Sequence, residues 1–385
     1  MSELIAAIIL YGVIGLIIYL KRDKFEWLQG VIFAYRSKKP LKWMDKLRPK
    51  SFIWKVFSTI CIPLGFYFMP QLVYLLADKA INIILNPGET AGVALAIPGV
   101  RIPGSPIYIP LFYGIISIAV LALVHEMAHG IIGKGEGISL KSSGFGMFLI
   151  FPLFFVEPDQ ESMKNTSRLS RLRMLSAGPG SNVILSFILL TLLSTTFMPF
   201  FTNNTVIEGV RITSVVNDYP AAKANITQGA IITGVNNKTI NNLTHFSSTL
   251  QDFSPGDELV INTKSNNYSL VATNNPNNKS LAYIGVFLRD EVSYSARAKA
   301  VYGEFFLGLL RIIYDLLLWV GFLNMSVGVM NLLPIWGLDG SRMLYDLLTY
   351  VMSNKKARAV TSFLSSLCIG LLIINIAPVF INLFI

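Results

Sequence analysis

The segment with the strongest chemical signal is VHEMAHG, residues 124–130, within the apolar run IISIAVLALVHEMAHGII. His125 and His129 are four residues apart, so on a helix both project from one face and can bind one metal ion. Neutral imidazole suits Zn²⁺, and Glu126 can take a proton from a metal-bound water. Ionisable groups are costly inside a membrane and usually functional there. The pattern therefore predicts part of a catalytic zinc site rather than two buried core histidines.

Two histidines leave a catalytic zinc ion one protein ligand short. The third histidine, His245, lies in a polar segment expected outside the membrane. Two aspartates lie in or beside apolar runs, Asp315 in RIIYDLLLWV and Asp339 in NLLPIWGLDGSRML. Glycines flank Asp339 and a proline precedes it, which interrupts a helix and turns an aspartate inward. We expect Asp339 to be the third ligand, and Asp315 to be interfacial or paired with Arg311 on the same helix face.

The composition indicates a polytopic membrane protein. Of 385 residues, 53% are hydrophobic and 14% are charged, whereas soluble domains have about a quarter charged residues. Spans need about 20 apolar residues, and the candidates are 4–20, 52–77, 106–132, 174–199, 305–333 and 360–385. We expect the first to be a retained span rather than a cleaved signal peptide, and segment 78–105 to be an interfacial loop. Cys61 and Cys368 are expected to be lone buried thiols.

The net charge of +10 is explained by membrane orientation. Lys and Arg accumulate in short cytoplasmic loops, and here they concentrate in 21–50, 133–173 and the turn with Lys355, Lys356 and Arg358. This distribution predicts that residues 200–300 lie outside and that VHEMAHG and GLDG lie toward the cytoplasmic side. No nucleic-acid-binding module is visible, so nucleic acid is not an expected partner.

Residues 203–290 differ in composition from the apolar segments. They are rich in Asn, Thr and Ser and contain alternating patterns such as GVRITSVV and DELVINTK, which predict a small mixed α/β or β domain. Asn-x-Ser/Thr triplets cluster here, in agreement with an outside location. They begin at Asn203, Asn225, Asn237, Asn242, Asn267 and Asn278.

HEMAH in one span and NLLPIWGLDG in a later one resemble the site-2 protease family of intramembrane zinc metalloproteases. SAGPGSN resembles the family motif that opens the span after the HExxH helix, and GISLKSSGFGMFLIFPLFFVEPD resembles its membrane re-entrant β-hairpin. GVRITSVVNDYPAAKANITQGAIITGVNNKTI resembles the PDZ domain that some members carry. The resemblance covers roughly residues 106–345. It departs from the family around LDG, where this chain has Ile335, Trp336 and Ser341.

The resemblance implies a role for each matching residue. His125, His129 and Asp339 would be the Zn²⁺ ligands, and Glu126 would be the general base and acid. Asn182 and Asn331 would hold the substrate backbone or stabilise the oxyanion, although hydrogen bonding between helices is an alternative for both asparagines.

We therefore expect a mostly α-helical polytopic membrane protein. It would have about six transmembrane helices, a re-entrant β-hairpin and a small extracytoplasmic PDZ-like α/β domain. The expected divisions are 1–105 (peripheral spans and basic loop), 106–202 (first catalytic half), 203–290 (PDZ-like domain), 291–345 (second catalytic half) and 346–385 (C-terminal span).

The expected function is zinc-dependent hydrolysis of peptide bonds in or near membrane spans. The substrates would be single-pass transmembrane proteins in the lipid bilayer of the cell membrane, and the zinc site must line a hydrated cavity. Hairpin 138–156 can offer an edge strand to an extended substrate, or it is a simple amphipathic loop. Two alternatives are a catalytically silent scaffold that binds peptides through the PDZ-like domain, and a zinc or ion transporter, which the lack of visible repeats disfavours.

Overall fold

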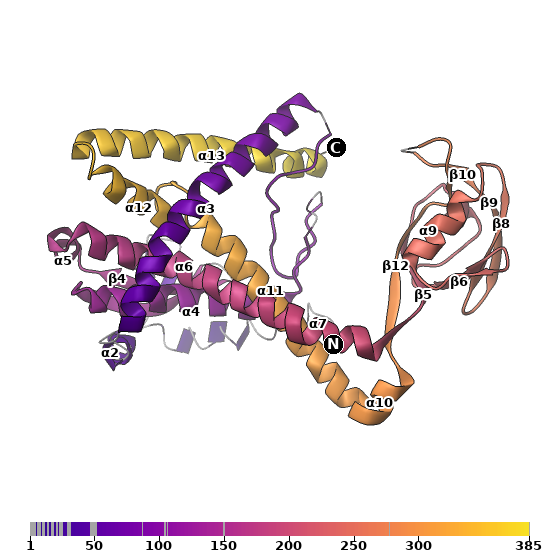
Figure 1. Cartoon of the computed structure of the whole chain (residues 1–385), viewed down its shortest axis with the longest axis horizontal. Helices are drawn as coiled ribbons and strands as arrows, with labels where there is room; N and C mark the ends of the chain where they lie inside the picture. Colours follow the sequence, from indigo (N-terminus) through magenta and orange to yellow (C-terminus); the bar gives the residue numbers. More distant parts are fainter. Residues whose placement is uncertain are drawn as a thin grey trace. The chain divides into compact units, whose positions relative to one another are not determined.

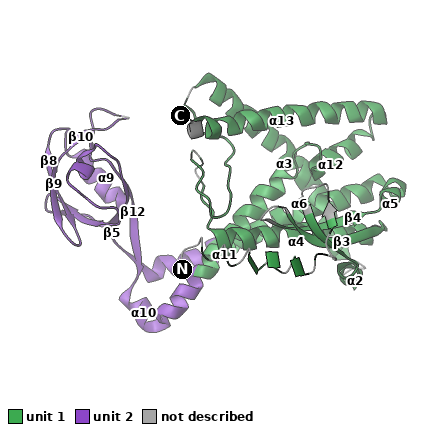
Figure 2. Cartoon of the chain, turned by 180° about the vertical axis from the view of Figure 1, so that it is seen from behind, with its two compact units in different colours: residues 1–193, 312–385 green, residues 194–311 purple. Residues whose placement is uncertain are grey.

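The computed structural model describes residues 26–28, 32–46 and 52–384, except 87, 104, 106, 149, 150 and 277, and isolated positions before residue 26. It divides into two compact units (Figure 2). Unit 1 contains Met1–Leu193 and Ile312–Ile385, and unit 2 contains Ser194–Arg311. The expected first span, 4–20, lies largely outside the described residues.

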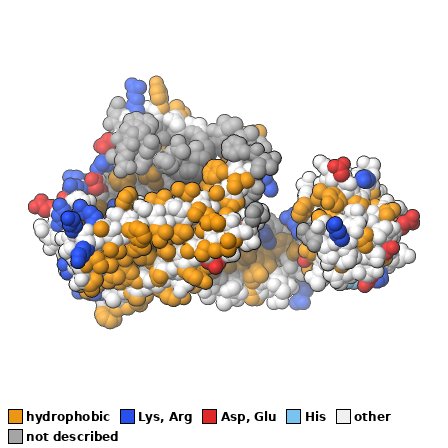
Figure 3. Space-filling view, turned by 90° about the horizontal axis from the view of Figure 1, so that it is seen from above, with side chains coloured by type: hydrophobic (Ala, Val, Ile, Leu, Met, Phe, Trp, Pro, Cys, Tyr) orange, Lys and Arg blue, Asp and Glu red, His pale blue; other side chains and the backbone are white. Residues whose placement is uncertain are grey.

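In the part of the chain that the structure describes, five helical segments are long and apolar enough to cross a membrane. They are α3 (Phe52–Leu85), α4 (Leu111–Gly135), α6 with its continuation (Arg168–Asn204), α11 (Glu304–Met330) and α13 (Asn354–Phe384). Each corresponds to an expected span. Hydrophobic side chains cover the flank of unit 1 that Figure 3 shows, whereas Lys and Arg gather at one end.

The third of these segments has three parts. α6 (Arg168–Leu192) is followed by one π-helical turn, η2 (Leu193–Phe197), and by α7 (Met198–Asn204). Ser167 caps the start of α6 because its hydroxyl accepts a hydrogen bond from Ser170 N at 3.1 Å.

α6 packs against both α3 and α4 (Figure 1). Its AGPG residues are small, and a Cβ atom on Gly180 would lie 2.5 Å from Cys61 Sγ of α3. On α11, a Cβ atom on Gly328 would lie 2.9 Å from the Cβ of Asn182. Small residues let membrane helices approach closely, so the SAGPGSN motif places α6 at the centre of the bundle.

α3 is longer than the expected span 52–77, because it continues to Leu85. The residues after 77 include Ala, Lys and Ile, which a helix accepts. Residues 78–85 are therefore helical rather than part of the expected interfacial loop 78–105. The following loop is held to the bundle by an ion pair between Lys79 and Glu89 at 2.5 Å. Gly92 N also donates to Asn375 O of α13 at 3.1 Å. Residues 89–92 of this loop are therefore anchored to both α3 and α13.

A four-stranded antiparallel sheet lies in unit 1, with the strand order β1-β2-β3-β4. Its strands are β1 (Glu26–Leu28), β2 (Ile32–Ser37), β3 (Leu140–Phe148) and β4 (Phe151–Pro158). β3 and β4 form the hairpin expected over 138–156. β1 and β2 were not expected, since the basic residues of 21–50 obscure the short alternating segment IFAYRS. β4 is at the end of the order and contacts α4.

Two short helices accompany this sheet. α2 (Lys39–Lys46) packs on α4, where Met44 and Ile131 share a small apolar core. Lys134 of α4 pairs with Asp45 at 2.5 Å and donates to Leu41 O at 2.9 Å. α5 (Gln160–Asn165) follows β4 directly and is capped by Asp159, whose carboxylate accepts from Ser162 N at 2.8 Å.

The remaining elements of unit 1 include α12 (Asp339–Leu348), which packs against both α6 and α13. A turn over residues 331–338 joins α11 to α12. Residues 349–353 join α12 to α13 (Asn354–Phe384). At the start of α13, Ser353 O accepts a hydrogen bond from Ala357 N at 2.9 Å.

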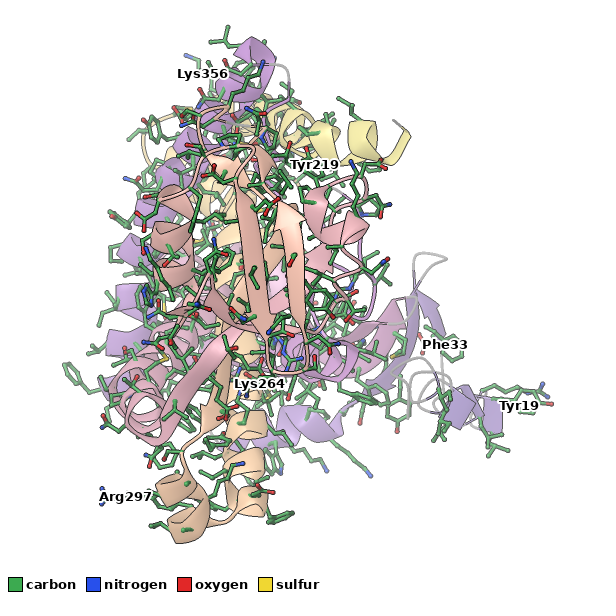
Figure 4. All side chains as sticks on the ribbon, turned by 90° about the vertical axis from the view of Figure 1, so that its right-hand side faces the viewer. Tyr19, Phe33, Tyr219, Lys264, Arg297 and Lys356 are labelled. Carbon is green, nitrogen blue, oxygen red and sulfur yellow. The ribbon has the colours of Figure 1, made fainter. Side chains whose placement is uncertain are left out.

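Unit 2 contains a second antiparallel sheet, in the order β12-β5-β6-β8-β9. The strands are β5 (Thr205–Val215), β6 (Ile231–Val235), β8 (Glu258–Thr263), β9 (Asn267–Val271) and β12 (Val286–Tyr294). Short strands β7 (Lys238–Thr239), β10 (Thr273–Asn274) and β11 (Ala282–Tyr283) and helices α8 (Pro220–Lys223), α9 (Leu243–Gln251) and α10 (Ala296–Tyr302) complete the unit. Tyr219 and Lys264 lie toward opposite ends of the sheet (Figure 4).

Unit 2, called the insert below, has its own apolar core. The alternating segments of the sequence supply this core. Val210 and Ile212 of β5, Ile232 of β6 and Leu259 and Ile261 of β8 are all fully buried. On the neighbouring strands, hydrogen bonds from Arg211 hold the pKa of the Glu291 carboxyl below its usual range. Unit 2 is therefore a compact unit with a hydrophobic core of its own rather than an extended loop.

Candidate metal centre

The two histidines lie on α4, one helical turn apart, and are nearly buried. Their Nε2 atoms are 3.0 Å apart, and their rings meet edge to face with centroids 4.6 Å apart. This is the arrangement that the i, i+4 spacing predicts for two ligands of one ion.

Asp339 is the first residue of α12, and the turn before it directs its side chain toward α4. Gly337 has φ +91°, and Gly340 N donates to Asn331 O at 2.9 Å. A Cβ atom on Gly340 would lie 2.0 Å from Leu332 O, so only glycine fits there. Asp339 Oδ2 lies 3.1 Å from the Nε2 atoms of both His125 and His129.

The three side chains each offer a ligand atom, and these atoms lie within 4.8 Å of one another. Among the described residues this is the single group of three or more His, Cys, Asp or Glu side chains with such geometry. Asp315, on α11, and His245, on α9, are not members of the group.

The space between the ligand atoms exists because α6 carries a glycine there. A Cβ atom on Gly178 would lie 2.3 Å from His129 Nε2 and 2.8 Å from His125 Nε2. Two imidazole nitrogens and one carboxylate oxygen are the donor set of a catalytic zinc site, with a fourth position left for water. The residues therefore fit a zinc ion.

A second layer of contacts fixes the imidazole rings. His129 Nδ1 lies 2.8 Å from Met174 O, so this nitrogen donates and Nε2 keeps its lone pair for a metal. Asn182 Nδ2 lies 3.3 Å from His125 Nδ1. Asn182 is fully buried, and its Oδ1 has no hydrogen-bond partner in the described part of the chain.

Glu126 connects the helix to the sheet. Its Oε2 accepts a hydrogen bond from Val156 N of β4 at 2.9 Å. A cavity of about 310 Å³ contains the site, and Glu126, the three ligand residues, Asn331 and Arg342 are among the residues that line it. Asn331 therefore faces the cavity, whereas Asn182 contacts the back of the His125 ring.

Sequence reasoning missed several contributors to this site. The Met174 carbonyl and the Val156 N–H are backbone groups, which have no signature in a sequence. Gly178 does have a signal, because small residues in AGPG indicate close helix contact, but its contact with the imidazoles depends on the packing of α6 on α4. Arg342 was missed because nothing in its spacing distinguishes it from other basic residues.

Comparison with known proteins identifies relatives. Residues 113–375 match the model of peptidase family M50. An uncharacterized protein, MJ0971, of Methanocaldococcus jannaschii is 29% identical over 350 residues, 88% of this chain and 82% of that protein. The regulator of sigma-W protease RasP of Bacillus subtilis is 26% identical over 220 residues, 46% of this chain and 49% of that protein.

Two solved structures match about a fifth of the chain. They are the PDZ domains of SdrC-like proteins from Listeria monocytogenes and Listeria innocua, each 24% identical and each covering 21% of this chain. They are matched over 87% and 93% of their own lengths, with TM-scores of 0.20 and 0.19.

The family match extends through α4, α6, α11 and α12 and so includes all three members of the cluster. The family match and the five apolar helices together define the class of protein as a multi-pass membrane metalloprotease. The chain belongs to peptidase family M50, and the resemblance to site-2 proteases is confirmed.

Proposed function

We propose that the protein is a zinc endopeptidase that hydrolyses peptide bonds within or near the transmembrane segments of single-pass membrane proteins. The observation that carries this proposal is the convergence of His125, His129 and Asp339 from two helices, with Glu126 at the wall of the same cavity. The membership of family M50 supports the reaction class. The three side chains would hold Zn²⁺, which when bound lowers the pKa of water and polarises a carbonyl.

The residues of the chain have distinct tasks in this reaction. Glu126 accepts the proton of the attacking water and transfers it to the leaving amine. The hydrogen bond from Val156 N holds one oxygen of Glu126 and leaves the other for the proton. Asn331, which lines the cavity, can donate to the carbonyl oxygen of the scissile bond.

The substrate must be extended at the scissile bond, because a helix shields its own carbonyl groups. Val156 N points to Glu126, so this edge of β4 faces the site. We propose that an extended substrate pairs with β4 as an added strand. The proposed location is the cell membrane, with the site toward the cytoplasmic side. The extracytoplasmic insert would be a PDZ-like docking platform or size filter.

The test combines metal content with cleavage of a model single-pass substrate. Wild type is expected to hold about one zinc ion per chain, and Asp339→Ala to lose most of it, whereas the matched variant Asp315→Asn keeps it. Glu126→Gln is expected to retain zinc and to lose cleavage by about 100-fold or more. A wild-type protein that binds no zinc, or a Glu126→Gln variant that cleaves normally, contradicts the proposal.

A further inference from the structure

A second cavity, of about 1010 Å³, lies in unit 1 between α5, α6, α12 and the start of α13. Its lining is strongly basic. Five cationic side chains contribute to it, namely Lys164, Arg168, Arg171, Arg342 and Arg358, and Asp346 is its one carboxylate. Lys164, Arg168, Arg171 and Arg358 belong to the basic segments that predict membrane orientation, whereas Arg342 lies outside those segments.

The single carboxylate is already used. Arg171 Nε and Nη2 donate to the two oxygens of Asp346, each at 2.9 Å. The other four cations form no ion pair with a carboxylate of the described residues. Arg168 lies over the ring of Tyr350 at 4.9 Å, which leaves its charge uncompensated. The cavity wall therefore carries an excess of four positive charges.

This cavity adjoins the catalytic one. Met163, Leu175 and Arg342 line both cavities. Arg342 lies one helical turn after Asp339 on α12, at the junction between the two spaces. A polypeptide that is extended through the catalytic cavity is thus led directly past these cations.

We propose that the basic cavity receives the substrate segment that flanks the scissile bond, and that it selects flanks that carry Asp or Glu. This inference rests on the proposed function. Segments beside membrane spans are commonly rich in Lys and Arg on the cytoplasmic side, and those charges are repelled in this cavity. Charge complementarity mainly supplies specificity, through attraction of one partner and repulsion of others. The cavity would therefore reject most membrane proteins and admit those with acidic flanks.

The test compares two substrates with the same transmembrane segment, flanked by three Glu or by three Lys, in liposomes of neutral phosphatidylcholine. The acidic flank is expected to give a kcat/KM about tenfold higher or more, since like charges in a partly enclosed site are unfavourable. The preference is expected to shrink as salt is raised. A substrate with neutral flanks is the reference for both.

The double variant Lys164→Glu/Arg358→Glu leaves three cations and three carboxylates in the lining, so it should abolish the preference for the acidic flank. The matched control is Lys355→Glu/Lys356→Glu, which makes the same change of charge at the start of α13 but does not alter the cavity lining. In the control the preference should remain. The readout is a ratio between substrates, so a general loss of activity does not imitate the effect.

The inference is overturned if the wild type cleaves both substrates equally, or if the double variant keeps the wild-type preference. In either case, zinc binding and cleavage by the wild type leave the proposed function standing. A rate that follows added anionic lipid instead of flank charge assigns the cavity to a lipid head group and also overturns the inference. If no substrate is cleaved and the wild type holds no zinc, the proposed function itself fails, and the inference fails with it.

Discussion

At the scale of single residues, the two imidazoles are held in different ways. His129 donates to a backbone carbonyl, whereas His125 faces the side-chain amide of Asn182. The nitrogen and oxygen of an amide are assigned from their surroundings, and a half-turn of this amide lets Oδ1 accept a hydrogen bond from His125 Nδ1. In that orientation Asn182 Oδ1, which has no other partner among the described residues, accepts the Nδ1 proton and leaves the Nε2 lone pair of His125 for a metal. We propose that Asn182 is a positioning residue for His125.

Asn182→Leu is therefore expected to lower zinc affinity by about 10–100-fold, because the ring of His125 loses its hydrogen-bond acceptor. Asn182→Asp replaces the amide oxygen with a carboxylate oxygen that can accept from His125 Nδ1 at the same place, so it should retain most of the affinity. Competition with a zinc chelator measures both. Asn324→Leu is the matched control, since Asn324 is also fully buried and its Oδ1 has no partner among the described residues. Its Nδ2, however, donates to Val320 O of its own helix. Equal losses in the two leucine variants would contradict the role of Asn182.

At the scale of elements, the position of α12 relative to α6 decides whether Asp339 reaches the histidines. The paired hydrogen bonds between Arg171 and Asp346 join these two helices. Arg171 also donates to Thr166 O at 2.7 Å, so it links α12 to the start of α6 and to the loop before it. Two parallel bonds between a guanidinium and a carboxylate restrict both distance and orientation. The pair consequently supports the site although it does not touch the ligands.

Arg171→Met is expected to reduce the free energy of unfolding by about 2–4 kcal/mol, because it leaves the Asp346 carboxylate largely buried and unpaired. Arg171→Met/Asp346→Leu should recover part of that loss. Denaturant unfolding in detergent micelles measures the cycle. The exposed pair Lys238–Asp252 in unit 2 is the comparison, and breaking it should change stability by less than about 1 kcal/mol. An equal effect at both pairs would rule out a structural role specific to Arg171.

At the scale of the whole molecule, the proposed orientation in the membrane follows from charge. The basic segments precede α3, join the end of α4 to the start of α6, and lie at the start of α13. Unit 2 follows the other end of α6 in the sequence. Both native cysteines, Cys61 and Cys368, are fully buried, so neither should react with a polar thiol reagent. This leaves a silent background for engineered cysteines at exposed positions.

Asn241→Cys in the insert is expected to react with a membrane-impermeant maleimide in intact cells, because its position is exposed and proposed to lie outside. Lys355→Cys, at the start of α13, should react only after the membrane is opened. Mass shifts on gels report the labelling, and unmodified wild type is the control. The reverse pattern would place the catalytic end of the bundle outside the cell.

Local patterns determined much of this protein. The spacing of His125 and His129 follows from helix geometry, and apolar length predicted the five spans that the described residues contain. The glycines that flank Asp339 and the proline before it mark this aspartate in the sequence as the expected third metal ligand. These features depend on residues close together in the chain, so the sequence alone reveals them.

Only the tertiary structure decided the rest, because it depends on contacts between distant segments. The meeting of α4, α6 and α12 brings Asp339, Gly178 and the Met174 carbonyl to the histidines across 45 to 210 positions of sequence. The pairing of β2 with β3 was hidden for the same reason, since a short strand is stabilised by its partner rather than by its own residues. The basic cavity likewise gathers side chains from four separate helices. Charge in one dimension indicates orientation, but only folding in three dimensions shows which charges share a space.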